Sequence, residues 1–466
     1  SEMCIRDRRY FDIEFDEGAG FDDTDPRNAY GPYFQRQRVE IYHTYAKSLV
    51  ERGLAYPCFC TEEELDKVRA KQEEDKVLTG YYGEYATCRN LSYEEVEANI
   101  KAGKPYVLRL RSQGSPDKEI TFVDAIKGEI KLPENIHDIV LLKKDGIPTY
   151  HFAHAIDDHL MRTTTVVRGG EWLASAPIHY ELFHLLGFKM PAYAHTAHLM
   201  KFDEETGGKR KLSKRKDPEL SLDYYRKDGY HPYTMKVYLL TLLNSNFEEW
   251  HEKFPDKDIN EFPFSVEKMN QSGALFDKDK LHNICKNELS KLSEEELYDF
   301  LYDWAKENEP ENVEKWFGDR EKMLQILRLY MGVGAKRRRK DLMYAKQIFE
   351  LISYFFDGES AEEMDEFKLD EDMVSKILKS YLAKYDHNDD NSVWFNKLKE
   401  IADEHGFASD MKAYKANPEN FKGNVSDIAE AVRIAVTGRA NTPDLWTIVH
   451  IMGEEQMTER IKKHIK

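Results

Sequence analysis

The segment from residue 207 to residue 220, GGKRKLSKRKDPEL, gathers six lysines and arginines behind two glycines. Glycine lets a backbone approach a ligand closely, and a lysine ammonium acts as a mobile point charge toward phosphate oxygens. A loop of this composition is therefore suited to holding phosphate groups. The alternative is a solvated basic surface that binds nothing, and the rest of the chain has to decide between the two.

The chain of 466 residues is acidic overall, with 86 Asp and Glu against 68 Lys and Arg and a formal net charge of -18. Such a chain can meet a polyanion only through a locally basic surface. Its hydrophobic content of 41% is enough for sizeable cores, so a globular protein is expected. The five cysteines argue against a disulfide framework, and no run approaches the roughly 18 apolar residues of a membrane span. We therefore expect a cytoplasmic protein with neither a membrane nor DNA as a partner.

The elements that must position the basic segment begin with helices. Residues 35–53 carry apolar side chains at helical spacing and end at a glycine, which predicts an amphipathic helix. Thr61 with Glu64, and Ser92 with Glu95, form capping boxes that predict two further helix starts.

Strands and strand-helix units are predicted next. Residues 105–150 alternate in short β-prone runs with an Asp-Gly hairpin turn, which predicts a mainly antiparallel patch. A helix that starts near Asp157, a strand at 163–169 and a helix at 171–186 should follow as units of an α/β domain. Beyond about residue 230 the apolar repeats have helical spacing, so the second half is expected to be all-helical.

The order of these segments resembles class I aminoacyl-tRNA synthetases, and most closely bacterial-type glutamyl-tRNA synthetase. The most specific block is DGIPTYHFAHAIDDHLMRTTTVVRGGEWLASAPIHYELFHLLGF at 145–188, followed at the family's spacing by KLSKR at 211–215. KLSKR is a variant of the family's Lys-Met-Ser-Lys-Ser loop. The resemblance implies an α/β fold: a partial Rossmann-type class I catalytic domain with an inserted α+β acceptor-binding domain, followed by all-α stem-contact and anticodon-binding domains.

The same resemblance divides the chain into five parts. The two catalytic halves are expected at 1–55 and 146–216, with the inserted acceptor-binding domain at 56–145. The stem-contact helical domain is expected at 217–290 and the helical anticodon-binding region at 291–466.

In the family, the KLSKR loop closes over ATP. The resemblance therefore implies catalytic roles for Lys211 and Lys214, with Lys214 against the triphosphate while charge moves onto the pyrophosphate leaving group. It assigns ATP contacts to Lys211, Leu212, Ser213, Lys214, Arg215 and Glu171. The other cations of the segment, Lys209, Arg210 and Lys216, are interpreted as ordinary solvated charges.

The amino-acid pocket also follows from the resemblance. Tyr150 and Arg168 match the family's substrate-contacting Tyr and Arg, and an arginine fork suits the carboxylate of glutamate. His154, also assigned to glutamate binding, stands where the family usually has Asn, which leaves the hydrogen bond expected there open. A core aromatic role is the alternative for Tyr150. The Asp-Asp-His string at 157–159 matches the family too, with a substrate or tRNA contact and a structural role as its two interpretations.

A metal site is suggested by three cysteines. Cys58 and Cys60, with Cys88 further along, resemble a zinc-binding insertion found in some members of the family. Three thiolates and one further ligand would complete tetrahedral zinc. Because Arg and Asn follow Cys88 where the pattern has a histidine, Tyr82 or Tyr85 would have to be the fourth ligand. Free thiols are the alternative.

A second basic run, AKRRRKD at 335–341, falls in the part of the chain that the resemblance assigns to tRNA binding. We expect a helix here, so that only some of Arg337, Arg338 and Arg339 face tRNA phosphates. A localisation signal or a solvated surface are the alternatives.

The reaction implied by the resemblance is the ligation of L-glutamate to tRNA(Glu) through glutamyl adenylate, with ATP and Mg²⁺, by a monomer. A second substrate, tRNA(Gln), stays open. The sequence has no His-Ile-Gly-His type signature, and the residues from about Tyr10 match a family segment well downstream of it. We therefore expect an N-terminally truncated chain that binds tRNA but is inactive or nearly so, with a tRNA-binding pseudo-synthetase as the alternative.

Overall fold

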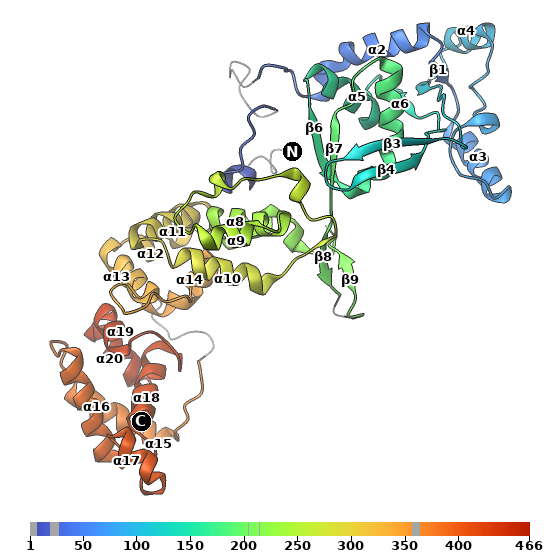
Figure 1. Cartoon of the computed structure of the whole chain (residues 1–466). Helices are drawn as coiled ribbons and strands as arrows, with labels where there is room; N and C mark the ends of the chain where they lie inside the picture. The colour runs from blue at the N-terminus through green and yellow to red at the C-terminus, as the bar shows by residue number, and fades with distance from the viewer. Residues whose placement is uncertain (1–6, 19–27, 204, 214, 357–363) are drawn as a thin grey trace. The chain divides into compact units, whose positions relative to one another are not determined.

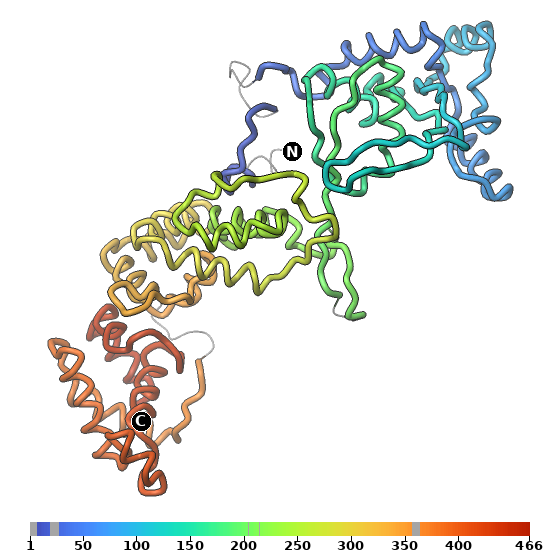
Figure 2. The backbone as a smooth tube through the Cα atoms, viewed as in Figure 1, coloured from blue at the N-terminus to red at the C-terminus, as the bar shows by residue number. Residues whose placement is uncertain are grey.

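The computed structural model describes residues 7–18, 28–203, 205–213, 215–356 and 364–466. The chain divides into two compact units, each described here by itself (Figure 1, Figure 2). The first unit contains Ile13–Asp217 and Leu239–Phe276, and the second contains Pro218–Tyr238, Asp277–Lys466 and the described residues before Ile13. The division into five domains stays a prediction.

A four-stranded sheet lies at the centre of the first unit. β6 (Thr165–Gly169) and β7 (Ala192–Thr196) pair in parallel, and β7 also pairs in parallel with β3 (Glu119–Asp124). β3 forms an antiparallel hairpin with β4 (Gly128–Pro133), which gives the order β4-β3-β7-β6. The predicted strand at 163–169 is confirmed. The sequence did not show that the β3–β4 hairpin extends the sheet of the parallel strands.

Three helices of the first unit pack on one another around a buried core. They are α2 (Val39–Glu51), preceded by the 3₁₀ turn η1 (Gln35–Arg38), α5 (Tyr150–Leu160), and α6 (Ala176–Leu186), preceded by η3 (Gly170–Ser175). Fully buried apolar side chains such as Leu49, Ile156 and Leu182 fill the space between them. The amphipathic helix predicted at 35–53 is confirmed, because its apolar stripe supplies part of this core.

The expectation that a helix starts near Asp157 is wrong, because α5 begins at Tyr150. Asp157 lies inside α5, and its carboxylate accepts hydrogen bonds from Arg38 Nε at 2.9 Å and from the Tyr42 hydroxyl at 2.7 Å. Asp157 therefore ties α5 to η1 and α2 instead of starting a helix.

A second, antiparallel sheet contains β1 (Ala55–Cys58), β2 (Val107–Leu110) and β5 (Val140–Leu142) in the order β1-β2-β5. It is accompanied by α3 (Glu62–Glu74), the 3₁₀ turn η2 (Gly83–Tyr85) and α4 (Tyr93–Lys101). Both predicted capping boxes are present at the starts of α3 and α4.

A small third sheet carries the basic segment. β8 (Leu199–Phe202) and β9 (Lys209–Lys211) form an antiparallel hairpin, and β10 (Ala274–Leu275) pairs in parallel with β8. The first unit also contains α9 (Phe247–Lys253), η5 (Ile259–Glu261) and η6 (Val266–Lys268). The basic segment is therefore a strand and its following turn rather than a loose loop.

All elements named within the described residues of the second unit are helices, which confirms the prediction for this half. Its elements are η4 (Pro218–Leu220), α7 (Leu222–Asp228), the first part of α8 (Pro232–Leu243), α10 (Lys278–Leu289), α11 (Glu294–Asn308), η7 (Pro310–Asn312), α12 (Val313–Phe317), α13 (Arg320–Met331), α14 (Ala345–Ile352), η8 (Ser353–Phe355), α15 (Glu371–Lys384), α16 (Asn391–His405), α17 (Met411–Ala416), η9 (Pro418–Asn420), α18 (Val425–Thr437), α19 (Leu445–Met452) and α20 (Glu454–Lys462). Fully buried side chains from several of these helices, among them Leu301, Ile326 and Ile401, form a continuous apolar core.

The helix expected for the basic run at 335–341 is absent from the structure. α13 ends at Met331, and Gly332 and Gly334 then take positive φ angles of 65° and 81°. This backbone conformation favours glycine and ends a helix. Of the helices built from described residues, none has the length and apolarity needed to cross a bilayer.

Candidate functional site

Arg168 stands near the carboxyl end of β6, directly beside His195 of β7 in the register of the two parallel strands. Ligands of α/β sheets commonly bind at this edge. The Arg168 guanidinium donates from Nε to His195 Nε2 at 3.0 Å, from Nη1 to His179 Nδ1 at 3.1 Å and from Nη2 to the Trp172 carbonyl at 3.4 Å. Arginine has five N–H donors, so one donor remains on each terminal nitrogen for a ligand.

Asp124 fixes the tautomer of His195. The Asp124 carboxylate lies 2.6 Å from His195 Nδ1 and also accepts from the His195 backbone N–H. Nδ1 must therefore carry the proton, which leaves the Nε2 lone pair to accept from Arg168. Burial raises the pKa of Asp124, but hydrogen bonds from His195 and from the backbone outweigh it and leave that pKa lowered.

The other face of Arg168 is held by a second imidazole. His179 of α6 is fully buried, and its Nε2 lies 2.9 Å from His151 Nδ1. Because His179 Nδ1 accepts from Arg168, its Nε2 carries the proton and donates to His151. We call Asp124, His151, His179 and His195 the histidine cradle of Arg168.

The rings of the cradle are neutral. Burial lowers the pKa of His151, of His179 and of His195, and the nearby positive charge of Arg168 lowers all three further. A protonated His179 or His195 would lose the lone pair that accepts from Arg168. Its positive charge would also repel the guanidinium. Burial therefore holds the cradle in the one protonation state that can orient a guanidinium.

Tyr150 forms an exposed aromatic wall beside this cradle. Its side chain is 46% exposed, and its ring lies 4.5 Å from that of Trp172 and stacks at 5.7 Å on that of His154. Both ring nitrogens of His154 are already engaged, with Nδ1 2.5 Å from the Asp158 carboxylate and Nε2 2.8 Å from the Tyr193 hydroxyl. The core alternative for Tyr150 is not what the structure shows, and His154 supports the wall rather than offering a nitrogen to solvent.

The string at 157–159 has structural contacts. Asp157 bonds Arg38 and Tyr42, Asp158 bonds His154, and the His159 ring stacks on Phe188 with 3.7 Å between the ring centroids. These contacts favour the structural interpretation of the string.

The β8–β9 hairpin is anchored by one buried carboxylate. Asp217 accepts two hydrogen bonds of 2.7 Å from Arg210 and another of 2.7 Å from the Ser213 backbone N–H, and Lys201 lies 3.0 Å away. The hydrogen bonds from Arg210 are the main cause that lowers the pKa of Asp217. The interpretation of Arg210 as a solvated charge is wrong, because its guanidinium holds the turn that carries Ser213.

Every residue expected to contact ATP in the KLSKR loop can be placed except one. The Leu212 side chain is buried and anchors the hairpin, Ser213 accepts at its Oγ from the Arg215 backbone N–H at 3.4 Å, and Arg215 itself is exposed. Lys214, the expected partner of the triphosphate, lies outside the described residues.

A chain of polar side chains connects the hairpin to the end of β6. Lys211 Nζ lies 3.4 Å from His198 Nε2, and His198 Nδ1 lies 3.4 Å from the Glu171 carboxylate. Glu171 belongs to η3, which follows Arg168 and β6 directly. The structure thus brings two predicted residues, Lys211 and Glu171, into one polar cluster near the cradle.

The three cysteines also come together. The Sγ atoms of Cys58, Cys60 and Cys88 all lie within 4.8 Å of one another, which confirms that their spacing places them in one cluster. The Tyr81 hydroxyl lies 3.3 Å from the Sγ atoms of both Cys58 and Cys60. Hydrogen bonds among these thiols lower the pKa of Cys58 and raise that of Cys60.

The expectation of Tyr82 or Tyr85 as a fourth ligand is wrong. Tyr82 donates its hydroxyl proton to the Leu78 carbonyl at 2.6 Å, and Tyr85 donates to Asp75 at 2.9 Å. Tyr81, one residue earlier in the chain, faces the thiols instead. The three thiols can supply three of the four ligands of tetrahedral zinc, and the Tyr81 hydroxyl lies beside two of them.

The basic run at 335–341 is an exposed segment of the second unit. Arg337, Arg338 and Arg339 are all exposed, and Arg339 pairs with Asp341 at 2.6 Å. Arg337 and Arg338 form no ion pair with any other described residue. The segment therefore presents two guanidinium groups without an ion pair at its surface, although Arg338 is close enough to Glu294 to help lower the pKa of that carboxyl.

Sequence reasoning missed Asp124, His179, His195, His198 and Asp217. One signal could have found part of this set: the string His-Thr-Ala-His at 195–198, which begins within the last residues of β7. Polar residues at the carboxyl end of a parallel strand are candidates for a ligand site. His179 had no such signal, because it is a single polar residue on the apolar face of α6.

Comparisons with known proteins agree with this arrangement. Residues 9–283 match the family described as tRNA synthetases class I (E and Q), catalytic domain, and residues 296–465 match an anticodon binding domain. The α/β catalytic part and the helical part that follows it are therefore those of a class I tRNA synthetase.

Individual relatives show to which family of class I tRNA synthetases the chain belongs. The chain is 52% identical to a glutamate–tRNA ligase of Acetivibrio thermocellus and 46% identical to one of Clostridium perfringens strain SM101, over 99% of this chain and 84% of each relative. It also matches the crystal structure of a glutamate tRNA ligase from Elizabethkingia meningosepticum in complex with its amino acid, at 25% identity with a TM-score of 0.73, over 99% of this chain and 88% of that one. The chain belongs to the glutamate–tRNA ligase family.

Proposed function

We propose that the site of this chain is built for the ligation of L-glutamate to tRNA(Glu) with ATP, the reaction for which its relatives are named. The observation that carries the proposal is the pairing of an arginine oriented by neutral imidazoles with a cationic hairpin whose Lys211 reaches toward Glu171. The first feature suits a carboxylate and the second suits phosphates. A glutamyl adenylate contains both groups.

The proposed reaction has two steps. The α-carboxylate of glutamate attacks the α-phosphorus of ATP, the bond from that phosphorus to the bridging oxygen breaks, and pyrophosphate leaves with glutamyl adenylate formed. A hydroxyl of the terminal tRNA ribose then attacks the acyl carbon and releases AMP, its proton passing to solvent. Mg²⁺ would enter with ATP and offset the charge of the phosphates.

The residues take separate roles in this scheme. The two remaining donors of Arg168 hold the side-chain carboxylate of glutamate as a fork, and the exposed ring of Tyr150 covers the substrate. Lys211, and Lys214 outside the described residues, stabilise charge on the phosphates as pyrophosphate leaves. Asp217 and Leu212 keep the hairpin in place, and Ser213, Arg215 and Glu171 lie beside the nucleotide.

The localisation, the oligomeric state and the domain division are proposed from the same family resemblance. We propose a cytoplasmic monomer whose five parts follow the boundaries predicted from the sequence, with tRNA(Gln) as a possible second substrate. Charging of purified tRNA(Glu) and tRNA(Gln) with labelled glutamate decides the last point, because a non-discriminating ligase charges both.

The decisive test is charging of tRNA(Glu), compared with that by the Acetivibrio thermocellus ligase. Charging by this chain supports the proposal. If charging is not detected, binding of tRNA(Glu) and of a hydrolysis-resistant glutamyl adenylate analogue is measured by calorimetry. Micromolar binding of both supports the assignment of the site, and binding of neither overturns it.

A finer proposal concerns the level of activity. The 466 residues contain no His-Ile-Gly-His type signature, the first ATP-binding motif of class I enzymes. We therefore propose that this chain alone is inactive or nearly so while still binding tRNA. Glutamate-dependent pyrophosphate exchange at the rate of the relative would overturn this. Loss of analogue binding with tRNA binding retained would favour the alternative, a tRNA-binding pseudo-synthetase.

Zinc is proposed for the cysteine cluster. Cys58, Cys60, Cys88 and Tyr81 would hold the ion and fix the short segment between β1 and α4, with a structural rather than a catalytic effect. Elemental analysis of the purified chain should give about one zinc per molecule, and Cys60→Ser should lose it, whereas Cys285→Ser, a buried cysteine of the second unit, should not. Absence of zinc from protein prepared in zinc-supplemented medium would contradict the proposal.

The exposed arginines at 337–339 are proposed to contact tRNA phosphates. Replacing Arg337 and Arg338 with alanine should weaken tRNA binding and lower the steepness of its salt dependence by about two charges. A matched change of Lys278 and Lys280 removes the same charge elsewhere in the second unit. Equal effects of both pairs would show that only net charge matters.

A further inference from the structure

Arg168 has a further neighbour besides the imidazoles of the histidine cradle, the ring of Tyr193 on β7. The guanidinium carbon lies over that ring, 4.5 Å from its centre. A guanidinium over the face of a tyrosine is attracted by the negative π surface, most strongly where water is excluded. Because Tyr193 is only 1% exposed, its ring supports Arg168 out of reach of water.

The Tyr193 hydroxyl leads into a buried row of hydrogen-bonded side chains. It lies 2.8 Å from His154 Nε2, and His154 Nδ1 lies 2.5 Å from the Asp158 carboxylate. Burial raises the pKa of Tyr193, so the phenol keeps its proton, and among the described residues only His154 Nε2 can accept it. The proton of His154 then lies on Nδ1, where Asp158 accepts it. We call Asp158, His154 and Tyr193 the tyrosine relay.

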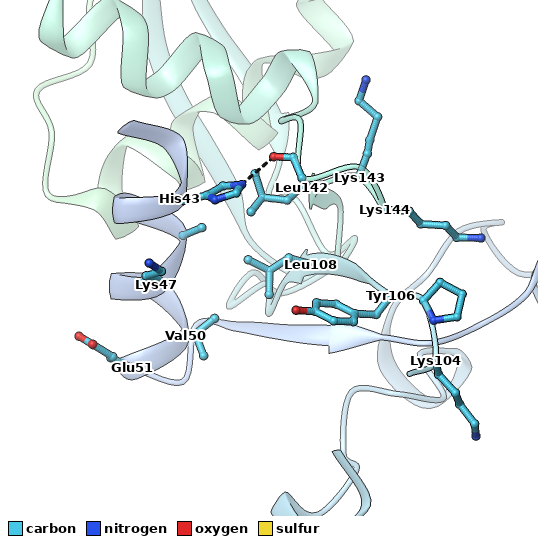
Figure 3. Close-up of a pocket in the computed structure, with 13 residues that line it drawn as sticks. His43, Lys47, Val50, Glu51, Lys104, Tyr106, Leu108, Leu142, Lys143 and Lys144 are labelled. Atoms are coloured by element: carbon cyan, nitrogen blue, oxygen red, sulfur yellow. Dashed lines mark hydrogen bonds between the residues drawn. The ribbon is translucent and has the colours of Figure 1, made fainter. Parts of the chain in front are cut away.

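The relay is built on regular elements. His154 and Asp158 are one helical turn apart on α5, and Tyr193 belongs to β7. The hairpin that precedes α5 is tied to α2 by a 2.9 Å hydrogen bond from His43 Nε2 to the Gly146 carbonyl (Figure 3). Side chains on helices and strands hold a functional group more precisely than side chains on loops do. The relay can therefore fix the tilt of the Tyr193 ring.

We propose that Tyr193 is a positioning residue for Arg168, and that Asp158 and His154 act on Arg168 through it. Asp158 fixes the tautomer of His154, and His154 fixes the Tyr193 hydroxyl. The ring of Tyr193 then holds the guanidinium at one angle without neutralising its charge. This inference deepens the proposed function and rests on it, because Arg168 is the proposed fork for the carboxylate of glutamate.

The alternative is direct contact between His154 and glutamate, the role expected from the sequence. The His154 side chain is buried, and both of its ring nitrogens face protein partners. Tyr150 stacks on its ring at 5.7 Å. An imidazole whose two nitrogens are both engaged has no further hydrogen bond to offer a substrate. These contacts favour a role through Tyr193 over direct contact.

The first measurement needs no ligand. The Nε–H group of Arg168, which donates to His195, gives an NMR signal that is assigned by its absence in Arg168→Lys. Exchange of this proton with solvent reports how firmly the guanidinium is held. Exchange should be about fivefold faster in Tyr193→Phe, which loses one buried hydrogen bond. It should be about thirtyfold faster in Tyr193→Leu, which loses the aromatic ring as well.

The matched control for the loss of a hydroxyl is Tyr42→Phe. The buried Tyr42 donates to Asp157 at 2.7 Å, the neighbour of Asp158 on the same helix. Exchange at Arg168 should stay within about twofold of the unaltered chain in this variant. Equal acceleration in Tyr42→Phe and Tyr193→Phe would overturn the proposal, because any lost hydrogen bond of α5 would then loosen the guanidinium.

Two substitutions of His154 separate the relay from direct contact. The amide nitrogen of His154→Asn takes the place of Nδ1 and still donates to Asp158, but nothing is left to accept from Tyr193. The amide oxygen of His154→Gln takes the place of Nε2 and still accepts from Tyr193. Calorimetry with the glutamyl adenylate analogue should give about fivefold weaker binding for His154→Asn and a loss of at most about twofold for His154→Gln. Unaltered or tighter binding by His154→Asn would overturn the proposal.

A double-variant cycle tests whether Asp158 acts through Tyr193. Asp158→Asn should weaken analogue binding about threefold in the unaltered chain but not in a chain that already carries Tyr193→Phe. Additive losses would overturn the relay. If the unaltered chain binds neither glutamate nor the analogue, the proposed function fails, and the exchange measurement at Arg168 still decides whether the relay exists.

Discussion

Arg168 and the β8–β9 hairpin both present cations to the proposed substrate, but they hold these cations by different means. Arg168 is oriented by uncharged imidazole lone pairs, with the nearest carboxylate, Asp124, one ring away. The hairpin is held by direct ion pairs of Arg210 and Lys201 with Asp217. The first arrangement leaves the full charge of the arginine for a ligand, whereas the second neutralises the anchoring cations and leaves Lys211 to face outward.

This difference has a physical basis. A guanidinium paired with a carboxylate would have little attraction left for a carboxylate substrate, and one without any partner would be poorly oriented. Neutral acceptors solve both problems, at the cost of keeping three histidines uncharged. The hairpin needs no such device, because its anchoring residues and its phosphate-facing residues are different side chains.

The largest effect is expected from Arg168→Lys. Lysine keeps the charge but cannot present a planar fork or reach both imidazole acceptors. Binding of the glutamyl adenylate analogue should weaken about 100-fold, as loss of hydrogen bonds to a charged group costs about 3 kcal/mol. Arg69→Lys, an exposed arginine of α3, is the control. Equal affinity of both variants would show that the cradle orients nothing that the substrate uses.

A smaller loss, about tenfold in analogue affinity, is expected from Asp217→Asn. The amide still bonds one neighbour, but it loses the bidentate contact with Arg210 and leaves that guanidinium without its main partner. Calorimetry measures the affinity, and hydrogen exchange of β8 and β9 reports loosening of the hairpin. Glu205→Gln, an exposed residue of the same hairpin turn, should change neither. Rigid strands with unaltered affinity in Asp217→Asn would contradict the anchoring role.

The cradle should make the first unit sensitive to acid. Because the folded pKa of His179 lies below its unfolded value of about 6.5, the unfolded chain takes up a proton below that pH and the folded chain does not. Local stability should therefore fall between pH 7 and pH 5, by up to about 2 kcal/mol for one such group.

Native-state hydrogen exchange of β6 and β7 measures this change. His179→Gln should reduce the loss between pH 7 and pH 5, whereas His184→Gln, an exposed position on the same helix, should leave it as it is. An identical pH profile in all three proteins would mean that His179 protonates freely in the folded state.

The smallest effect is expected from Lys209→Ala, which is compared with Lys211→Ala in the same hairpin. Lys209 and Lys211 lie on the same strand, but only Lys211 approaches His198. Lys209→Ala should alter analogue affinity by less than about twofold, and Lys211→Ala by about tenfold. Equal losses would show that the hairpin acts as a diffuse basic surface, the interpretation that the sequence alone left open.

The sequence predicted what depends on local spacing. The capping boxes at Thr61 and Ser92 and the amphipathic stripe of α2 involve residues a few positions apart, and all were confirmed. Cys58, Cys60 and Cys88 could be grouped because a motif fixes their separation. The tyrosine beside these cysteines could not be identified from the sequence. Which of the neighbouring tyrosines faces the thiols depends on the conformation of the turn that carries them.

Contacts between distant segments were beyond prediction. Asp124, His179 and His195 come from a hairpin, a helix and a strand, and each is a single polar residue in its own segment. The start of α5 was misplaced near Asp157, a residue that lies inside the helix and bonds Arg38, more than one hundred residues away. The basic run at 335–341 lies outside a helix, contrary to the prediction, because two glycines with positive φ precede it.

The most direct test of the account compares two single variants, Arg168→Lys and Lys211→Ala. The affinity of each is measured for three ligands: glutamate, ATP and the glutamyl adenylate analogue. The account predicts that Arg168→Lys weakens glutamate and the analogue but leaves ATP within about twofold, whereas Lys211→Ala weakens ATP and the analogue but leaves glutamate unchanged. Binding of the analogue that is insensitive to either substitution would contradict the claim that cradle and hairpin act on one substrate.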